Sequence, residues 1–436
     1  MRETDVVVIG GGMAGLIAAL EVVRAGRSCV LVEKSDKVGG RAISVKKGGA
    51  IFNLGGHAVY QGGEAYSILQ ELGVRMTGGS PSYKVAGIWD GQVVPLGDPA
   101  KLMFSSFLSW AGKLELGRLF MRLKSLDTSR LPVMSVREWA EQEVRDPLVR
   151  HIFYALTRTA TYTFDPDSQV AGPALKQVGR SLKSGVRYVD GGWQSIVDQL
   201  REKAVQAGVQ LLESTGVSRI EQEQGAVRRI ELADGRVLQT ASVISTATPA
   251  DTYRMTEGAE HTLLRRWKEE ARPVMAACLD LCLKRLPVTG RNVAIGLDCP
   301  IFFSNHSAAS RLSDDGTVVV HLIKYNGSGE KDARADLSQL EAAMTLLHPG
   351  WERGVVARQF LPNLTVVQDY PHMGGSQANV GPSVPGIAGL YVAGDWASHG
   401  ELLVDAAAAS ARRAARQAVH ELHIGESSAG GRIAVM

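Results

Sequence analysis

Residues 5–41, DVVVIGGGMAGLIAALEVVRAGRSCVLVEKSDKVGGR, decide the fold of this chain. The apolar run Val6–Ile9 predicts a buried strand, and the Ala-, Leu- and Val-rich run after the glycines predicts a helix. A second apolar run, 28–32, ends in Glu33. Strand, glycine-rich turn, helix, strand and acid in this order form the βαβ unit that binds dinucleotides.

The glycines follow the pattern Gly10-x-Gly12-x-x-Gly15. We expect Gly10 to make the tight turn, Gly12 to let the backbone approach a pyrophosphate, and Gly15 to let the helix close onto the strand. Met13 and Ala14 begin that helix, whose free N–H groups and positive dipole end favour phosphates. Both residues therefore belong to the expected cofactor-binding set.

Glu33 lies 18 residues after Gly15, and Lys34 follows it. A carboxylate at this distance can accept hydrogen bonds from both ribose hydroxyls, and it would repel a 2′-phosphate. The sequence therefore disfavours NADP, and we place Glu33 and Lys34 in the cofactor site.

Composition sets the wider limits. The chain has 436 residues, of which 45% are hydrophobic and 21% charged, which is enough for two globular domains. The net charge is +3 and no basic tract indicates nucleic-acid binding. The four cysteines have no CxxC spacing, so we expect structural thiols in a reducing compartment and no metal site. They are Cys29, Cys278, Cys282 and Cys299.

The start of the chain and its hydropathy pattern predict a cytoplasmic protein. The first predicted strand begins almost at residue 1, which leaves no room for a signal or transit peptide. No run of about 18 apolar residues exists, so no membrane span is expected.

Two further segments identify the nucleotide. Val38-Gly39-Gly40-Arg41-Ala42 follows the acid, and the run 389–395, GLYVAGD, lies near the other end. With these segments the chain resembles the FAD-dependent superfamily that includes the monoamine oxidases, protoporphyrinogen oxidase and the phytoene desaturases. The resemblance extends over nearly the whole chain. It implies that the GGR segment and the late Gly-Asp pair both contact FAD.

FAD is too long for one βαβ unit, so a second segment must hold its ribityl and isoalloxazine end. The residues before Gly394 predict a strand, and Gly394-Asp395 predicts the turn at its carboxyl end, where such sheets bind ligands. We expect Asp395 to accept hydrogen bonds from cofactor hydroxyls; the alternative is a simple turn aspartate.

A helix-forming run begins at Asp405 and continues with Ala406. The resemblance implies that its N-terminus points at the flavin N1–C2=O edge and favours the anionic reduced flavin. Leu403, Asp405 and Ala406 are therefore assigned to the cofactor site. A plain helix cap is an equally open interpretation of Asp405.

The run Leu54-Gly55-Gly56-His57-Ala58 resembles the glycine pair that passes close to the isoalloxazine ring in this superfamily. His57 is the first candidate for an active-site polar group, as a proton acceptor or as a donor to a flavin carbonyl. A core histidine bonded to backbone is the alternative. Trp396 either lines the flavin or substrate cavity or fills a gap in the core.

We predict an α/β fold: a discontinuous Rossmann-like FAD-binding domain and a mixed α+β substrate-binding domain. The first comprises 1–60, 190–250 and 360–425, and the second 61–189 and 251–359. The last residues, 426–436, predict a flexible tail.

Within 190–250 we expect a helix that ends near residue 207 and strands near 210–212, 226–232 and 243–246. The turn 233–236 is expected to join two of these strands as a hairpin. The resemblance implies that Val217 contacts the adenine end through its backbone and that Thr246 lies beside the cofactor.

The segment 101–126 mixes large apolar residues with Lys and Arg. As one amphipathic helix it could lie on a membrane surface and admit a lipid-like substrate. Packing inside the substrate domain, with a solvated basic face, is the favoured interpretation.

The expected chemistry is hydride removal from a C–C bond of a mainly apolar small molecule, as in a desaturase. No second GxGxxG exists, so the substrate itself would reduce the flavin, and O₂ or another acceptor would reoxidise it. The amine oxidases carry a lysine in a substrate-domain strand, and the run 273–281 lacks one; Lys284 is the nearest. No cysteine follows Cys299, so FAD should be non-covalent.

Three alternatives stay open at this stage. One is an amine oxidase acting on a C–N bond, and another is a flavin-dependent isomerase or mutase without net redox turnover. The third is a non-enzymatic binding protein, since the Rab GDP dissociation inhibitors share the architecture. Substrate identity and oligomeric state do not follow from the residues.

Overall fold

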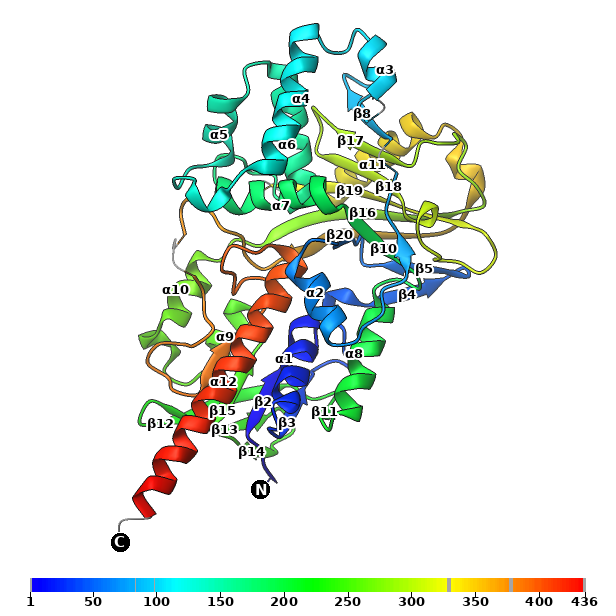
Figure 1. Ribbon diagram of the computed structural model, residues 1–436. Coiled ribbons are helices and arrows are strands. Elements are labelled where there is room, and N and C mark those ends of the chain that lie inside the picture. The colour runs from blue at the N-terminus through cyan, green and yellow to red at the C-terminus, as the bar shows by residue number, and fades with distance from the viewer. Residues whose placement is uncertain (1, 83, 98, 328–330, 376–378, 434–436) are drawn as a thin grey trace.

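The computed structural model describes residues 2–82, 84–97, 99–327, 331–375 and 379–433. A five-stranded parallel sheet with its helices occupies one end of the molecule, and a seven-stranded mixed sheet with its own helices occupies the other (Figure 1). The predicted fold class, a Rossmann-like domain joined to a mixed α+β domain, is confirmed.

The parallel sheet is built from five segments that lie far apart in the sequence. Its order is β11-β3-β2-β15-β21, and every neighbouring pair is parallel. Alternate residues of β2 enter two different apolar cores, Val6 and Val8 on one face, Val7 and Ile9 on the other. The near-continuous apolar run follows from burial on both faces. The strands span Gln210–Leu212 (β11), Cys29–Val32 (β3), Val6–Ile9 (β2), Ser242–Ser245 (β15) and Leu390–Val392 (β21).

Helices cover one face of this sheet, and a second sheet covers the other. The first core joins α1, α8 and α12, and the opposite core includes α9, α10 and a small sheet of order β1-β14-β13-β12. The helices span Met13–Arg24 (α1), Gln194–Gln206 (α8), Leu403–Ile433 (α12), Pro249–Met255 (α9) and Leu263–Glu270 (α10).

The small sheet corrects the predicted hairpin. The strand predicted at 226–232 exists as β13 (Ala226–Leu232), but the turn 233–236 joins it to β14 (Val237–Gln239), not to 210–212 or 243–246. Strands β12 (Val217–Glu223) and β1 (Arg2–Glu3) were also not predicted. Much of β12 is polar and solvent-facing and is held by pairing with β13, so it lacks a clear apolar alternation.

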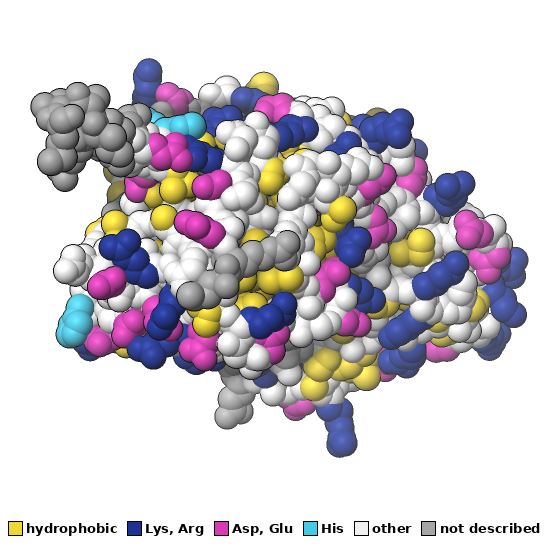
Figure 2. All heavy atoms as spheres, turned by 90° about the horizontal axis from the view of Figure 1, so that it is seen from below, with side chains coloured by type: hydrophobic (Ala, Val, Ile, Leu, Met, Phe, Trp, Pro, Cys, Tyr) yellow, Lys and Arg dark blue, Asp and Glu magenta, His cyan; other side chains and the backbone are white. Residues whose placement is uncertain are grey.

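The charged side chains of this end of the molecule are mixed in sign. Figure 2 shows Lys and Arg alternating with Asp and Glu over most of the face seen from below. Several form ion pairs, such as Arg229 with Glu221 at 2.8 Å and Arg219 with Glu257 at 2.7 Å. This face therefore offers no uniformly basic surface to a polyanion.

The seven-stranded sheet has the order β20-β16-β19-β18-β17-β8-β9. In β16, Leu279 and Leu281 pack with α11 (Ala333–Leu347), whereas Cys278, Asp280 and Cys282 alternate with them and face the opposite side. The strands span Val355–Val367 (β20), Val274–Leu283 (β16), Val318–Asn326 (β19), Ile301–Asn305 (β18), Val293–Gly296 (β17), Val85–Trp89 (β8) and Gln92–Pro95 (β9).

Short strands and α2 connect the two ends. Strands β6, β10 and β7 form a three-stranded sheet, and β4 pairs with β5. The range 360–425, predicted to belong to the FAD-binding domain, in fact begins inside β20 of the seven-stranded sheet. The elements span Ser44–Lys47 (β4), Ala50–Asn53 (β5), Val59–Tyr60 (β6), Glu64–Glu71 (α2), Gly78–Gly79 (β7) and Val186–Val189 (β10).

Helices α3 to α7 cover the end of the seven-stranded sheet formed by β18, β17, β8 and β9 (Figure 1). Segment 101–126 is not one helix: α3 ends at Phe104, and Ser109 starts α4 by accepting a hydrogen bond from the Gly112 N–H at 3.0 Å. Ser135 and Glu138 form a capping box at the start of α5. The helices span Pro99–Phe104 (α3), Trp110–Ser125 (α4), Val136–Glu143 (α5), Pro147–Thr161 (α6) and Ala171–Ser184 (α7).

The apolar face of α4 packs inside this helical layer through Leu116, Leu119 and Leu123. Phe104 and Trp110 nevertheless stay 91% and 71% exposed. Contact of this edge with a membrane surface therefore stays the less favoured alternative. Among the described helices, none is both long and apolar enough to cross a bilayer.

Helix α12 continues beyond the point where the sequence predicts a tail. It passes Gly425 and ends at Ile433, so most of 426–436 is helical, and 434–436 lie outside the described residues. Arg27 explains part of this extension, because its guanidinium donates to the Glu426 carboxylate at 2.6 Å and contacts His423 at 2.9 Å. Composition alone does not show such a contact from a distant turn.

The start of α12 is fixed by Asp405, whose side chain is fully buried. Its Oδ1 accepts from the Ala65 N–H of α2 at 2.9 Å, and Oδ2 accepts from Arg180 of α7 at 3.0 Å. Arg180 also donates to both oxygens of Glu64. Gly63, the N-cap residue of α2, has no side chain that could cap this helix. Asp405 of α12 caps α2 in its place.

We expect Asp405→Ala to lower the free energy of unfolding by about 1 kcal/mol or more through loss of this cap, while Asp405→Asn keeps the acceptor and loses less. Burial raises the pKa of Asp405 to about 6, so ionising it becomes a cost as the pH rises from 4 to 7. The Asn variant should therefore gain stability relative to the wild type over that interval in urea unfolding. Unchanged stability with weakened FAD binding would instead indicate a direct flavin contact.

Candidate active site

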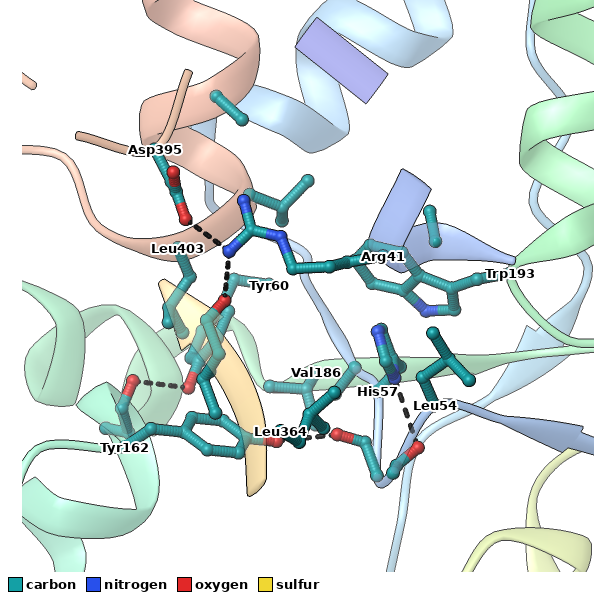
Figure 3. A pocket seen from close by; sticks show the side chains of 18 of the residues that line it. Arg41, Leu54, His57, Tyr60, Tyr162, Val186, Trp193, Leu364, Asp395 and Leu403 are labelled. Atoms are coloured by element: carbon teal, nitrogen blue, oxygen red, sulfur yellow. Dashed lines mark hydrogen bonds and ion pairs between the residues drawn. The ribbon is translucent and has the colours of Figure 1, made fainter. Parts of the chain in front are cut away.

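A single cavity of about 1320 Å³ runs from the turn after β2 to the helical layer above the seven-stranded sheet. Figure 3 shows side chains from both halves of the molecule around it. The lower end is lined by the glycine-rich turns and the upper end by apolar and aromatic side chains.

The turn after β2 has the geometry that a pyrophosphate requires. Gly10 has φ +97°, and a Cβ on Gly15 would lie 1.8 Å from the Gly10 carbonyl oxygen, so helix and strand touch there. A Cβ on Gly12 would meet nothing within 4 Å, because this residue faces the cavity. Met13 and Ala14 line the cavity where α1 begins without a side-chain cap. Their N–H groups are therefore placed for an anion.

Glu33 is buried beside this turn. Its Oε2 accepts from the Gly11 N–H at 2.6 Å, and its Oε1 accepts from the Ser35 N–H at 2.8 Å. Each oxygen keeps a second lone pair, as ribose hydroxyls would need. Lys34 lines the cavity next to it.

The GGR segment is held against the same turn. The Gly39 N–H donates to the Gly11 carbonyl at 2.8 Å, and Gly40 approaches Gly12 closely. Arg41 then reaches across the cavity to pair with Asp395 at 2.7 Å (Figure 3). The two sequence signatures, more than 350 residues apart, therefore meet in one ion pair.

Asp395 is more constrained than the sequence suggests. Its Oδ2 accepts from Arg41 and also from the Gln368 N–H at 3.1 Å, so hydrogen bonding to a cofactor hydroxyl falls to Oδ1. The preceding Gly394 has φ +132°, and Ser410 of α12 bonds both its N–H and its carbonyl at 2.9 Å. The turn is therefore locked onto the helix.

Thr246 joins β15 to the glycine turn. Its hydroxyl donates to the Ile9 carbonyl at 2.8 Å, and it lines the cavity together with Val217 at the start of β12. Their contact with the cofactor stays a prediction of the resemblance.

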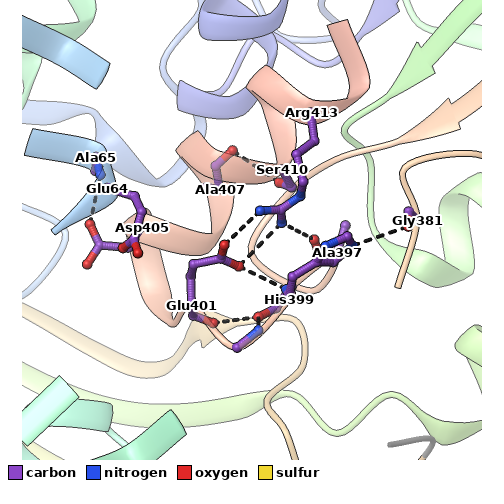
Figure 4. A network of polar contacts seen from close by, with 12 residues as sticks. Glu64, Ala65, Gly381, Ala397, His399, Glu401, Asp405, Ala407, Ser410 and Arg413 are labelled. Atoms are coloured by element: carbon purple, nitrogen blue, oxygen red, sulfur yellow. Dashed lines mark hydrogen bonds and ion pairs between the residues drawn. The ribbon is translucent and has the colours of Figure 1, made fainter. Parts of the chain in front are cut away.

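A loop held by ion pairs leads into α12 (Figure 4). Glu401 accepts from Arg413 at 2.7 Å and from the His399 N–H at 2.8 Å, while Arg413 also donates to the Ala397 carbonyl. The helix then begins at Leu403, which has φ +57° and lines the cavity. This loop aims the N-terminus of α12 at the cavity, where it favours negative charge.

Gly55, Gly56 and His57 line the middle of the cavity. Gly55 has φ +82°, and a Cβ there would lie 2.8 Å from the Cys278 sulfur. The Gly56 carbonyl accepts from the Tyr162 hydroxyl at 2.6 Å. Backbone, rather than side chain, therefore forms this part of the wall, next to Leu54.

His57 has features of both an active-site group and a core histidine bonded to backbone. It lines the cavity, and its Nδ1 bonds the Gly55 carbonyl at 3.1 Å while its ring contacts the edge of Trp193 (Figure 3). Burial lowers the pKa of His57, so the ring is neutral at pH 7. The Gly55 carbonyl and the backbone of Arg41 both hold this ring at the cavity wall.

Trp396 also has a mixed role. Its indole N–H donates to the Ala247 carbonyl at 3.0 Å, and the ring is 4% exposed and packs near Trp267. It fills the core beneath the sheet and still lines the cavity.

Three residues assigned to the cofactor site do not line the cavity, Gly15, Asp405 and Ala406. Gly15 lies behind Gly10, in the helix–strand contact expected of it. Asp405 turns toward α2 and α7, as described above. Ala406 is fully buried in α12.

The upper wall of the cavity could not be found from the sequence. It combines side chains from helices and from three sheets, and no local motif marks them, since each one looks like an ordinary core residue. Those with aromatic rings are Tyr60, Phe120, Tyr162, Tyr188, Trp193, Phe302, His306 and Tyr325. No group of three His, Cys, Asp or Glu side chains in the described part of the chain is arranged to hold a metal ion.

Comparison with known proteins agrees with this geometry. The profile of the family described as flavin containing amine oxidoreductase matches residues 13–274, more than half of the chain. The chain therefore belongs to this family of flavoprotein oxidoreductases, and the resemblance given by its motifs is confirmed.

The names of its relatives indicate two kinds of reaction, desaturation or oxygenation in some and amine oxidation in others. The 4,4′-diapolycopene oxygenase of Methylomonas sp is 27% identical over 55% of this chain and 55% of that protein. The neurosporene-forming phytoene desaturase of Rhodobacter capsulatus is 26% identical over 57% and 53%. A putative flavin-containing monoamine oxidase of Mycobacterium tuberculosis is 27% identical over 51% and 52%. The chain thus spans about half the length of the curated relatives it matches.

Solved structures share the whole fold. An oxidoreductase from Methanosarcina mazei superposes with a TM-score of 0.76 at 19% identity, covering 93% of this chain and 98% of that one. The structure of putrescine oxidase bound to putrescine superposes with a TM-score of 0.75 at 16% identity, covering 96% of this chain and 99% of that one. At such identities the likeness establishes the fold alone.

We expect Gly12→Val to fold but to lose FAD binding, because the added side chain enters only the cavity. Its backbone, at φ −70°, accepts any residue. Gly15→Val is the contrasting variant and should fail to fold, since its Cβ would overlap the Gly10 carbonyl. Thermal unfolding and bound-flavin absorbance measure both effects. A yellow, fully loaded Gly12→Val protein would contradict this placement of the pyrophosphate.

Glu33→Ala should weaken FAD affinity about tenfold, through loss of hydrogen bonds to ribose, and leave flavin reduction unchanged. Fluorescence titration of the apoprotein with FAD measures this loss. An unaltered Kd for FAD would show that Glu33 does not bind the ribose.

Proposed function

We propose that the chain is an oxidoreductase that holds FAD non-covalently and removes hydride from a C–C bond of a mainly apolar small molecule. When bound, FAD supplies the hydride acceptor. The residues of the lower cavity hold the nucleotide, and the N-terminus of α12 favours the charge of the reduced ring. The upper cavity receives the substrate.

The observation that carries the C–C assignment is the distribution of carboxylates around the cavity. The acidic residues that line it are Glu33, Asp251 and Asp395. Glu33 and Asp395 belong to the nucleotide turns, and Asp251 lies on α9, where Arg254 pairs with it at 2.6 Å. The described upper wall contains no carboxylate. An ammonium substrate buried there would have no counter-ion, whereas an apolar chain needs none.

The strand β16 supports the same choice. Its one residue on the cavity wall is Cys278, and Lys284 follows the end of the strand. The lysine that amine oxidases carry in such a strand therefore has no counterpart on this wall. Burial raises the pKa of the Cys278 thiol well above its usual value, which keeps it protonated and unreactive toward a flavin.

Anaerobic bleaching of the flavin against a panel of polyenes, primary amines and amino acids tests the proposal. We expect a polyene or related apolar chain to reduce the flavin and the amines to leave it oxidised. Bleaching by amines alone would contradict the C–C assignment. Turnover of a compound without bleaching and without any acceptor would indicate an isomerase.

A pair of variants checks that the upper cavity holds the substrate. Leu156→Trp fills space on the cavity wall and should slow bleaching by a long polyene while the FAD content stays constant. Leu114→Trp is the control, because Leu114 is 57% exposed on α4 and does not line the cavity. Equal bleaching rates in the two variants would show that the substrate does not bind in the upper cavity.

A further inference from the structure

A row of polar side chains crosses the centre of the seven-stranded sheet. Gln359 of β20, Asp280 of β16, His321 of β19 and Ser304 of β18 are direct cross-strand partners. Asp280 and His321 have no exposed surface at all. Burying such groups costs free energy unless they are paired, so the row calls for a function beyond packing.

Strand alternation directs this row toward the cavity. Residues on either side of Asp280 pack with α11, so Asp280 itself faces the opposite side, as Cys278 does two positions earlier. His321 has the same orientation as Ile323, which touches Gly56. A methyl group built on Gly56 would lie 3.6 Å from His321 Cβ and 3.8 Å from His306 Nε2. The row therefore lies directly behind the Gly55-Gly56 wall.

The hydrogen bonds of Asp280 fix the proton on His321. Oδ1 of Asp280 accepts from His321 Nδ1 at 2.7 Å, and Oδ2 accepts from the Gln359 amide at 3.1 Å. That amide also donates to the Asn53 carbonyl at 3.1 Å, which orients it as the donor. His321 therefore carries its proton on Nδ1 and a lone pair on Nε2. This Nε2 is buried and has no hydrogen-bond partner in the described structure.

His306, at the start of the short 3-10 helix His306–Ala308, separates His321 from the cavity. Its ring meets that of His321 edge to face, with centroids 4.3 Å apart. On another side it stacks on Tyr188, with centroids 3.6 Å apart. The His306 ring is therefore packed between the rings of Tyr188 and His321 at the cavity wall.

We propose that His306 is the proton acceptor of the reaction at the cavity wall, and that His321, oriented by Asp280, is a positioning residue that holds the His306 ring in place. This inference rests on the proposed C–C oxidation. The groups that face His306 are His321, His57, Asp280 behind His321, and the Tyr188 ring. Burial, His321 and His57 lower the pKa of His306 well below its usual value, so it is neutral and able to accept.

The chemistry of a C–C desaturation needs such a base. One carbon loses a hydride, with its electron pair, to bound FAD, and the neighbouring carbon loses a proton. The electron pair of that second C–H bond becomes the new π bond, and the proton forms a bond to His306. The substrate is oxidised by two electrons, and the imidazolium so formed lies against the edge-to-face ring of His321, which Asp280 holds.

The first test replaces the acceptor. His306→Ala should retain FAD and slow substrate-driven flavin reduction about 10²- to 10⁴-fold, and added imidazole should restore part of the rate. His348→Gln is the matched control, since His348 is equally buried but does not line the cavity. A wild-type rate in His306→Ala, or a slow rate that imidazole does not raise, would overturn the assignment.

The second test needs no activity. The ¹⁵N spectrum of histidine-labelled wild-type protein should show His321 protonated on Nδ1 and unprotonated on Nε2, as the Asp280 contact requires. Asp280→Asn should reverse this tautomer and slow flavin reduction about 100-fold or more with little change in KM. A doubly protonated His321, or one protonated on Nε2, in the wild type would overturn the proposal even if a variant fails to fold.

These readouts separate the two proposals. If only amines bleach the flavin, the C–C assignment fails while the His321 tautomer stays measurable. If polyenes bleach it equally fast with His306→Ala, the C–C assignment stands and the role of His306 fails.

Discussion

The parallel pairing of β2, β15 and β21 is the constraint on which the rest of the structure depends. Parallel strands end at the same edge of a sheet, so three segments distant in sequence deliver Gly10, Thr246 and Gly394 to one line. Hydrogen bonds from Thr246 to the Ile9 carbonyl and from the Ala393 N–H to the Ser245 carbonyl lock these ends together. The same alignment brings Asp395 within 2.7 Å of Arg41, and both side chains line the cavity.

The second sheet converts this nucleotide site into a candidate active site. Its long central strands bury one face against α11 and present the other to the Gly55-Gly56 segment, so the substrate space lies between the two halves of the molecule. Apolar and aromatic groups dominate the far wall, and the polar row behind it is reached through His306. Membership of the family implies a flavin cofactor. The residues of the cavity wall are what support an apolar substrate over an amine.

The sequence predicted the nucleotide half well because that half is encoded locally. The residues from Val6 to Arg41 carry strand, turn, helix, acid and GGR in one continuous run, and Glu33 and Gly39 bond back to the Gly11 backbone of the same run. The Gly394-Asp395 turn was found only through family resemblance. The upper wall and the row of Gln359, Asp280 and His321 were missed, because single polar residues inside apolar strands acquire meaning only from cross-strand register. Asp405 was ambiguous for the same reason: its partners, Ala65 and Arg180, are remote.

The most direct test of the account is the absorption spectrum of the purified chain, recorded before and after acid precipitation. The cavity geometry predicts a yellow protein with about one FAD per chain, all of it released into the supernatant. A colourless protein that cannot be reconstituted with FAD would contradict the flavoprotein assignment, and a flavin that stays with the precipitate would contradict non-covalent binding.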